Sequence, residues 1–338
     1  MRLAKAPRGA YFRARRAARA LGREVSTEVD RARYRHRGGA DLALFHEFVP
    51  APTGGGHQFL RALLAELERR GLEVELNRIS RETPACLFNS FNFDFRRLHR
   101  FARSGCRLVH RVDGPIGVYR GFDDGTDARV ARINHELADA TVVQSRYSLA
   151  AHRELGIELA APVLIRNAVD PSIFYPAAER GPLERRKVRL IASSWSDNPN
   201  KGTDVLEWLD RNLDWTSFHL TFAGRSAAAF ERIRTIGAIS SFRLADELRG
   251  HDIYLAPSRH DPSSNALLEA LACGLPAVYR SSGGHFELVG EAGLPFEEAE
   301  EIPDALSRLV GELEERRAAI RVQALTEAAD RYLEVLRG

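Results

Sequence analysis

The stretch that decides the fold is "DPSSNALLEALACGLPAV", residues 261–278, which follows the apolar segment "DIYLAPS" at 252–258. The pattern reads as a strand, a polar loop, a short helix and a second strand, and this order is typical of a parallel sheet covered by helices. Ser263 or Ser264 is a good N-cap for the helix. Ligands of such sheets bind beyond the carboxyl ends of the strands, so we expect this loop to line a binding site.

The same alternation extends over most of the chain. It predicts strands at 41–48, 72–76, 84–89, 106–110, 141–144, 161–165, 188–194, 218–224, 252–258 and 275–280. Helices are predicted at 57–71, 93–105, 128–140, 145–156, 202–213 and 264–274, and the stretch 304–337 is expected to be helical to the end. The Pro-rich and charged stretch 166–187 interrupts the rhythm. The expected fold is therefore α/β, with two facing, doubly wound Rossmann-like domains and a cleft between them.

The domain boundaries follow from these patterns. We predict a basic N-terminal arm at 1–37, a first domain at 38–170, a linker at 171–187, a second domain at 188–315 and a C-terminal helix at 316–338.

Composition places the chain among soluble globular proteins. A hydrophobic content of 44% and a charged content of 28% are ordinary for that class. No apolar run reaches the length of a membrane-spanning helix, and no signal peptide is recognisable, so we expect a cytoplasmic protein. Cys86, Cys106 and Cys273 are far apart in apolar surroundings, and we interpret them as reduced core thiols.

The charge is unevenly distributed. Residues 1–37 contain twelve Lys or Arg and three Asp or Glu, a net charge of +9, whereas the whole chain has +3. Three interpretations stay open: a plain solvated tail, an interfacial helix on the inner face of an anionic membrane, and a nucleic-acid contact. We expect no nucleic-acid partner.

Two acids in the opening stretch are candidates for binding polyols. Asp261 lies where a strand ends, and Glu269 lies about two turns into a helix that is apolar nearly all round. A buried acid needs a partner, and an ionised carboxylate accepts pairs of hydrogen bonds from sugar or ribose hydroxyls. The simpler alternatives are an ordinary loop acid and a helix-surface acid.

Lys201 is a candidate phosphate ligand. It lies in "SSWSDNPNKGTDVL", residues 193–206, after a strand and directly before a helix. A compact ammonium group and a helix start both favour a phosphate. The alternative is an exposed loop lysine.

Two further segments lie at predicted strand ends. The loop with Gly54, Gly55 and Gly56 allows close approach of a ligand, although it is not a dinucleotide fingerprint. The segment "VHRVDGP", residues 109–115, ends a strand with polar side chains that we expect to face the cleft, although His110 suits a structural role nearly as well.

In these motifs the chain resembles the retaining nucleotide-sugar glycosyltransferases of family 4, over roughly residues 41–338. The opening stretch is followed by "SSGGHFELVGEAGLPF", and "RNAVDPSIFYP" and "NKGTDVL" resemble the hinge and the phosphate loop of that family. The matching positions in these motifs are Asn167, Val169, Asp170, Phe174, Pro176, Gly274, Pro276, Gly283, Gly284 and Glu287.

The resemblance implies a GT-B fold and a set of roles. Glu269 would hold the donor ribose, Asp261 the transferred sugar, and Lys201 the diphosphate, while His110 would touch the sugar near the reacting carbon. The expected catalytic residues are Asp261, Lys201 and His110. The expected donor-binding residues are Glu269, Lys201, Arg225, Ser263, Ser264, Asn265, Trp195, Gly55 and Gly56. Arg111 and Asp113 are expected on the acceptor side, in the first domain.

Neither a metal nor another cofactor is implied, since family members usually need none. The pair Asp123 and Asp124 lies in a Gly-rich loop and is interpreted as a turn. The implied partners are a nucleotide-diphosphate sugar and a glycan or lipid-linked acceptor.

Three positions depart from the family pattern. The first acid is Asp261 rather than Glu, and Pro262-Ser263-Ser264 stands where Gly-Phe-Gly is frequent. Trp195 occupies the position of a phosphate-clamping Arg, and Arg225 is the candidate to replace it. These changes predict an unusual donor sugar.

The expected activity is sugar transfer with retained configuration in surface polysaccharide synthesis, with the leaving phosphate taking the acceptor proton. The alternatives are a nucleotide-sugar epimerase and a catalytically silent nucleotide-sugar binder.

Overall fold

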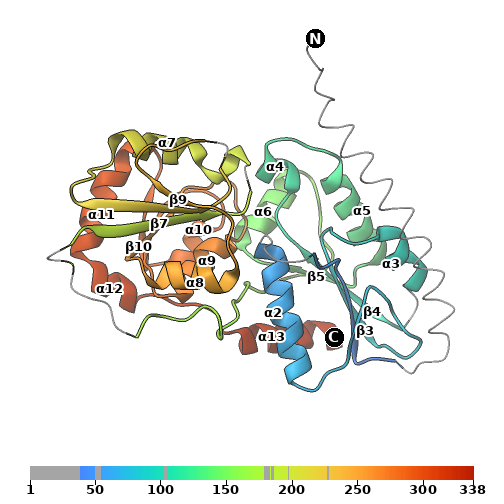
Figure 1. Cartoon of the computed structure of the whole chain (residues 1–338). Helices are drawn as coiled ribbons and strands as arrows, with labels where there is room; N and C mark the ends of the chain where they lie inside the picture. Colours follow the sequence, from blue (N-terminus) through green and yellow to red (C-terminus); the bar gives the residue numbers. More distant parts are fainter. Residues whose placement is uncertain are drawn as a thin grey trace, which may run out of the picture.

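A computed structural model describes residues 39–49, 55–102, 105–178, 183, 186–196, 198–226 and 228–338. The basic arm at 1–37 and Gly54 lie outside the described residues. The described chain forms two six-stranded parallel sheets, each flanked by helices (Figure 1). The predicted fold of two Rossmann-like domains is therefore confirmed.

The first sheet has the strand order β2-β1-β3-β4-β5-β6. Its strands are β1 (Leu42–Phe45), β2 (Val74–Leu76), β3 (Ala85–Asn89), β4 (Arg107–Val112), β5 (Ala140–Val143) and β6 (Pro162–Leu164). Its helices are α2 (Gly55–Arg69), α3 (Phe95–Phe101), α4 (Ile116–Arg120), α5 (Thr126–Leu137) and α6 (Arg146–Glu154). The register pairs Asn89 with Arg111, so the polar ends of β3 and β4 lie side by side.

The second sheet has the order β12-β11-β10-β7-β8-β9. Its strands are β7 (Val188–Ser194), β8 (Phe218–Gly224), β9 (Arg234–Ile236), β10 (Ile253–Ala256), β11 (Ala277–Arg280) and β12 (Gly293–Phe296). Its helical segments are η1 (Pro199–Lys201), α7 (Thr203–Asn212), α8 (Ser241–Arg249), α9 (Asn265–Ala272), α10 (His285–Val289), η2 (Ala299–Glu301), α11 (Ile302–Gly311) and α12 (Leu313–Ala318). The short elements β9, α8, α10 and β12 were not among the predicted elements.

Helix α9 forms where the opening stretch predicts it. Ser264 is the N-cap, and its side chain accepts a hydrogen bond from the backbone N–H of Leu267. The helix is buried on most sides, and Leu267 and Leu271 belong to the core beside β10 and β11. The confirmed N-cap places the start of α9 directly after the loop that contains Asp261.

The stretch 304–337, expected to be helical to the end, is interrupted. The chain forms α11 and α12, leaves helical structure at 319–324, and resumes as α13 (Leu325–Arg337). Leu306 of α11 packs in the core of the second sheet, whereas Tyr332 of α13 packs in the core of the first. Figure 1 shows α13 with the first domain, beside α2. The apolar stripe serves two different cores, so the chain must turn between them.

The cysteines are free and buried, in agreement with core thiols. Over the described residues, no helix combines the length and the apolar character needed to cross a membrane.

The return of α13 to the first domain gives a stability prediction. Leu336 is buried among α13, α2 and the first sheet. Leu336→Ala should lower the free energy of unfolding of the first domain by about 2–5 kcal/mol, because it removes apolar contacts and leaves a cavity. Urea unfolding measures the loss. The exposed Glu334→Ala is the matched control, and an equal effect of both changes would contradict the packing role.

Candidate active site

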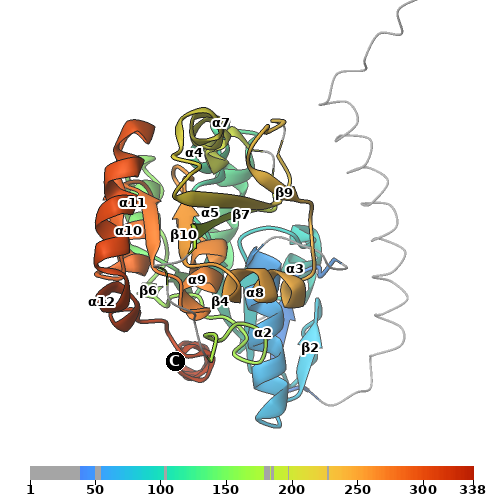
Figure 2. The same cartoon turned by 60° about the vertical axis from the view of Figure 1, so that its left-hand side comes forward.

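Side chains from both sheets meet at one cleft. Asn167, which follows β6, donates from Nδ2 to Oδ1 of Asn265 at the start of α9, over 3.1 Å. Gln58 of α2 donates to the Ser241 hydroxyl of α8 over 2.6 Å. Figures 1 and 2 both show the upper end of α2 against α8 and α9. The first turn of α2 and the start of α9 therefore border the same interdomain space.

Lys201 and Asp261 form a largely buried ion pair beyond the strand ends of the second sheet, with side chains that are 20% and 7% exposed. The ammonium nitrogen of Lys201 lies 2.8 Å from Oδ2 of Asp261 and 4.9 Å from the centre of the Tyr119 ring, which belongs to the first domain. Burial alone would raise the pKa of Asp261, but Lys201 holds that pKa below its usual value. Burial opposes the charge of Lys201 as well, and Asp261 still raises the pKa of Lys201. Both groups are therefore charged at neutral pH.

The loop after β11 fixes the position of Asp261. The backbone N–H of Gly284 donates to the carbonyl of Asp261 over 2.8 Å. Gly283 has a φ of +68°, and a Cβ atom there would lie 2.3 Å from the same carbonyl oxygen. Only glycine fits this approach without a shift, which gives the Gly-Gly motif a structural reason.

Glu269 lies in the wall of a small cavity at the interdomain cleft. The cavity measures about 90 Å³ and is lined by residues of both domains. Its walls include Gln58, Ser193, Ser194, Trp195, Gly224, Ser241 and Glu269. The side chain of Glu269 is 7% exposed, and among the described residues no hydrogen bond or ion pair reaches its carboxylate. Burial raises the pKa of Glu269 to about 8. Glu269 is thus a buried acid whose partner is missing from the protein itself.

Trp195 and Arg225 lie together beside this cavity. The Arg225 guanidinium carbon is 4.5 Å from the centre of the Trp195 ring, and Arg225 is exposed. Gly224, directly before Arg225, passes very close to the end of β7. A Cβ atom there would lie 1.8 Å from the Ser194 carbonyl oxygen, so only glycine fits. The structure therefore places Arg225 directly beside Trp195, as its expected role as a substitute requires.

Arg111 is fully buried at the end of β4 and is held by three polar side chains. Its Nη1 donates to Oδ1 of Asn89 over 2.8 Å and to Oδ1 of Asp113 over 2.9 Å, and its Nη2 donates to Oδ1 of Asn167 over 3.0 Å. The guanidinium also lies over the Phe59 ring. We expected Arg111 to face the acceptor, but its burial makes it an organiser of neighbouring side chains. Asp113 keeps 26% of its side chain exposed.

The prediction that His110 touches the transferred sugar is not supported by the geometry. His110 has zero exposure, its ring stacks on Phe88 at 4.2 Å, and its Nδ1 lies 3.1 Å from Nδ2 of Asn134. Its Nε2 is also enclosed and has no hydrogen-bond partner among the described atoms. Burial lowers the pKa of His110 to about 3. His110 is a neutral histidine of the first domain's interior.

The other predicted donor residues lie at the starts of two helices, α2 and α9. Gly55 and Gly56 form the first positions of α2, where a loop was expected. Ser263 and Ser264 are nearly buried, and Asn265 bridges to the first domain. Among the described residues, no group of three or more His, Cys, Asp or Glu is arranged to hold a metal ion.

A set of interdomain contacts was missed by the sequence reasoning. The side-chain amides of Asn198 and Asn200 each donate to the Tyr119 carbonyl over 3.0 Å. The Glu287 carboxylate accepts the backbone N–H groups of Arg146 and Tyr147, both over 2.9 Å. Polar residues in the phosphate loop were visible in the sequence, but their partners lie in another domain. No local pattern could have paired them.

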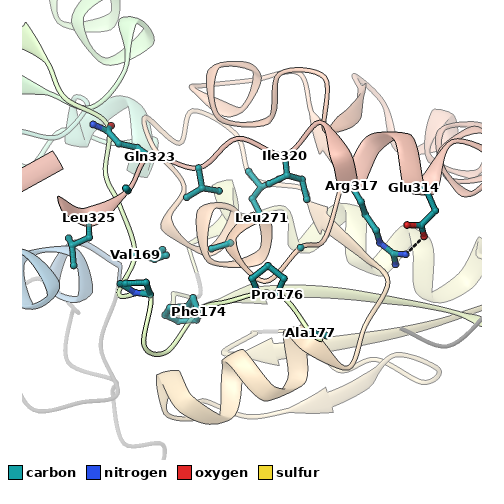
Figure 3. Close-up of a pocket in the computed structure, with 15 residues that line it drawn as sticks. Val169, Phe174, Pro176, Ala177, Leu271, Glu314, Arg317, Ile320, Gln323 and Leu325 are labelled. Atoms are coloured by element: carbon teal, nitrogen blue, oxygen red, sulfur yellow. Dashed lines mark hydrogen bonds and ion pairs between the residues drawn. The ribbon is translucent and has the colours of Figure 1, made fainter. Parts of the chain in front are cut away.

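A larger cavity of about 730 Å³ lies away from this site, under the hinge (Figure 3). Its apolar wall comes from the hinge segment around Phe174, from Leu271, and from the segment around Ile320 that leads to α13. Figure 3 shows the Arg317–Glu314 ion pair at one end. Size alone would favour this cavity, but the polar side chains with perturbed pKa values gather in the cleft.

A known protein family matches part of the second domain. Residues 196–312 match the family described as "Glycosyl transferases group 1", a segment that contains Lys201, Arg225, Asp261 and Glu269. The prediction of a glycosyltransferase-class enzyme is thereby confirmed, and neither the epimerase nor the silent binder is favoured. No curated protein sequence matches the chain.

Several solved structures share the fold. Sucrose-phosphate synthase from Thermosynechococcus elongatus is 17% identical, with a TM-score of 0.64 over 87% of this chain and 94% of that one. HepE from Anabaena in complex with UDP-glucose is 15% identical, with a TM-score of 0.61 over 87% and 95%. AviGT4, a glycosyltransferase involved in avilamycin A biosynthesis, is 22% identical, with a TM-score of 0.56 over 88% and 97%.

The raised pKa of Glu269 gives a pH prediction. Between pH 4.5 and about 8 the folded protein holds a proton on Glu269 that the unfolded chain has lost, so this residue's contribution to stability falls as pH rises through that range. Glu269→Gln removes the dependence. The difference in melting temperature between Glu269→Gln and the native protein should therefore shift in favour of the variant from pH 5 to pH 8.5. A constant difference would show that Glu269 ionises normally.

Proposed function

We propose that the chain transfers a sugar from a nucleotide-diphosphate sugar to a glycan or lipid-linked acceptor, with retained configuration, as a family 4 glycosyltransferase does. The observation that supports this most is the buried carboxylate of Glu269, which lines a cavity between the domains and has no hydrogen-bond partner among the described residues. The Lys201–Asp261 ion pair lies beyond the strand ends of the second sheet. A ribose diol would satisfy Glu269, and a diphosphate would share the charge of Lys201.

The charges suit a leaving diphosphate. Lys201 is cationic and keeps 20% of its side chain exposed, and Arg225 supplies a second, exposed cation beside Trp195. As the glycosidic bond breaks, negative charge grows on the phosphate oxygen, and fixed cations in a low-dielectric site stabilise that charge. Asp261 would then turn from its ion pair to the sugar hydroxyls. The acceptor proton goes to the leaving phosphate oxygen, on the face from which the diphosphate departs.

The donor needs room that this closed form does not provide. A volume of about 90 Å³ is far below the roughly 300–1,000 Å³ of ligand pockets. The Arg225 side chain on Trp195 and the hydrogen bond from Gln58 to Ser241 border this space. We propose that donor entry separates these contacts and that closure restores them around the donor.

The first test is thermal melting with a panel of nucleoside diphosphates and nucleotide sugars that includes UDP and UDP-glucose, the ligands named for the HepE structures. One nucleotide series should raise the melting temperature, because a ligand at about 100 times its Kd adds about 2.7 kcal/mol of stability. No shift with any member of the panel would contradict the donor site.

Glu269 should determine nucleotide affinity. Glu269→Ala should weaken binding of the active nucleotide about 10- to 100-fold, since a hydrogen bond to a charged group contributes about 1.5–3 kcal/mol. Isothermal calorimetry measures the affinity, and Glu334→Ala, an exposed glutamate of α13, is the control. Unchanged affinity of Glu269→Ala would remove the ribose role.

Asp261 should act on transfer more than on nucleotide binding. Asp261→Asn keeps the shape of the side chain but loses its charge. It should slow sugar transfer about 100-fold, the equivalent of one or two charged hydrogen bonds, while nucleoside diphosphate affinity stays within a few-fold. Full transfer activity in Asp261→Asn would show that this residue does not hold the sugar.

A further inference from the structure

Two histidines of the first domain form a hydrogen-bonded pair that the proposed function does not use. Nε2 of His46, which follows β1, lies 2.8 Å from Nδ1 of His57 in the first turn of α2. His46 is 1% exposed, whereas His57 is half-buried. On its other side, Nδ1 of His46 lies 3.4 Å from Nδ2 of Asn89.

The two histidines are the last members of a series of hydrogen bonds that begins at Arg111 and passes through Asn89. Arg111 fixes the orientation of the Asn89 side-chain amide. A guanidinium only donates hydrogen bonds, so the atom of Asn89 that lies 2.8 Å from Nη1 must be the amide oxygen Oδ1. With its oxygen turned to Arg111, Asn89 presents its NH₂ group to His46 and to the Phe91 carbonyl, 3.3 Å away. The amide orientation is therefore settled by chemistry.

The orientation of Asn89 then fixes which nitrogen of each imidazole ring is the donor and which is the acceptor. Nδ1 of His46 must accept from Asn89, so in the neutral ring the proton is on Nε2. That proton is donated to Nδ1 of His57, which must also be an acceptor. The proton of His57 is consequently on Nε2, the ring nitrogen on the far side from His46.

Both rings are neutral at physiological pH, as the argument requires. Burial, together with His57, Arg111 and Arg61, lowers the pKa of His46 to about 3. Burial and Arg61 also lower the pKa of His57. No acidic group opposes these effects among the causes of either shift.

His57 belongs to the first turn of α2, the turn that borders the cleft through Gln58. Gln58, the next residue, reaches across the interface to Ser241 of α8 and lines the cavity that contains Glu269. The upper end of α2 faces the second domain in both views (Figures 1 and 2). A half-buried donor at this place can reach a ligand held between the domains.

We propose that His57 is a fixed hydrogen-bond donor, through Nε2–H, to a phosphoryl or hydroxyl oxygen of the bound substrate, and that Arg111, Asn89 and His46 are positioning residues that hold it in this tautomer. His57 therefore binds an oxygen lone pair and does not deprotonate the acceptor. The identity of the ligand rests on the proposed sugar transfer, but the tautomer does not.

The first experiment reads the tautomers directly. Long-range ¹H–¹⁵N spectra of the full-length protein at pH 7 and pH 8.5 should show His46 and His57 with a bare Nδ1 and a protonated Nε2. The chain has eleven histidines, so loss of single signals in His46→Gln and His57→Gln assigns the two. A protonated Nδ1 on His57, or a doubly protonated ring at pH 7, would overturn the proposal even if the chain transferred no sugar.

The second experiment reverses the donor and acceptor roles in this series of hydrogen bonds with a side chain of nearly the same shape as Asn89. In Asn89→Asp a carboxylate accepts from both Arg111 and His46, so the proton of neutral His46 moves to Nδ1 and that of His57 moves to Nδ1 as well. At pH 8.5, where His46 is neutral, the spectra should show this reversal. Asn92→Asp, an exposed position nearby, is the matched control and should leave both tautomers unchanged. An unchanged His57 tautomer in Asn89→Asp contradicts the relay.

The third experiment identifies the oxygen. Gln can place an amide N–H near the position of Nε2, whereas the shorter Asn places it near Nδ1. His57→Gln should keep transfer within about 10-fold of the native rate, and His57→Asn should lose about 10- to 100-fold, the range for one lost hydrogen bond to a polar or charged group. Loss of nucleoside diphosphate affinity in His57→Asn indicates a phosphoryl oxygen, and loss of transfer alone indicates a hydroxyl. Native affinity and native transfer in both variants would overturn the substrate contact.

Discussion

The Arg111 guanidinium has no exposure, and its burial orders the polar side of the first domain. A buried cation must be surrounded by acceptors, or its desolvation would cost several kcal/mol. The acceptors come from three strand ends: Asn89 is the last residue of β3, Asp113 follows β4 and Asn167 follows β6. Asn167 continues the network to Asn265 at the start of α9 in the other domain. One charge thus links the strand ends of the first domain, the segment after β6 and the helix that contains Glu269.

The two acids eight residues apart are kept in different states by different neighbours. Asp261 is ionised because Lys201 offsets its desolvation, whereas Glu269 faces burial without a counter-charge. The contrast follows from the fold. The segment η1 brings Lys201 to Asp261 in the loop before α9. Glu269 lies within α9, where neighbouring side chains such as Leu267 and Leu271 are apolar and core-buried. A donor that brings hydroxyl groups to Glu269 would favour its ionised form, and thus nucleotide binding and proton release would be coupled.

The sequence predicted much of the framework because the pattern is local. Buried parallel strands such as β7 and β8 are continuous apolar runs, and the leucines around Glu269 already indicated a buried acid. His110 and Arg111 show where local reasoning stops. Adjacent residues of a strand point to opposite faces, so both could not face the cleft: Arg111 turns toward Phe59 of α2, and His110 turns toward Phe88 and Asn134. Contacts such as Asn198 with Tyr119 depend on how two domains meet, which no spacing within one segment encodes.

Pro262 gives a physical meaning to the departure from the family pattern. Proline has no N–H to offer a sugar, but its ring makes a close interdomain contact. A Cβ atom added at Gly114 would lie 2.7 Å from Cβ of Pro262, so only glycine allows the turn after Asp113 to approach this loop so closely. The loop that contains Asp261 is therefore shaped by the first domain as well as by the second. Tyr119 also covers Lys201 from the first domain, so the surroundings of the Lys201–Asp261 pair are completed only when the domains are together. The contact between the two domains is therefore part of how the Asp261 loop is shaped, and Pro262 contributes a rigid ring to that contact.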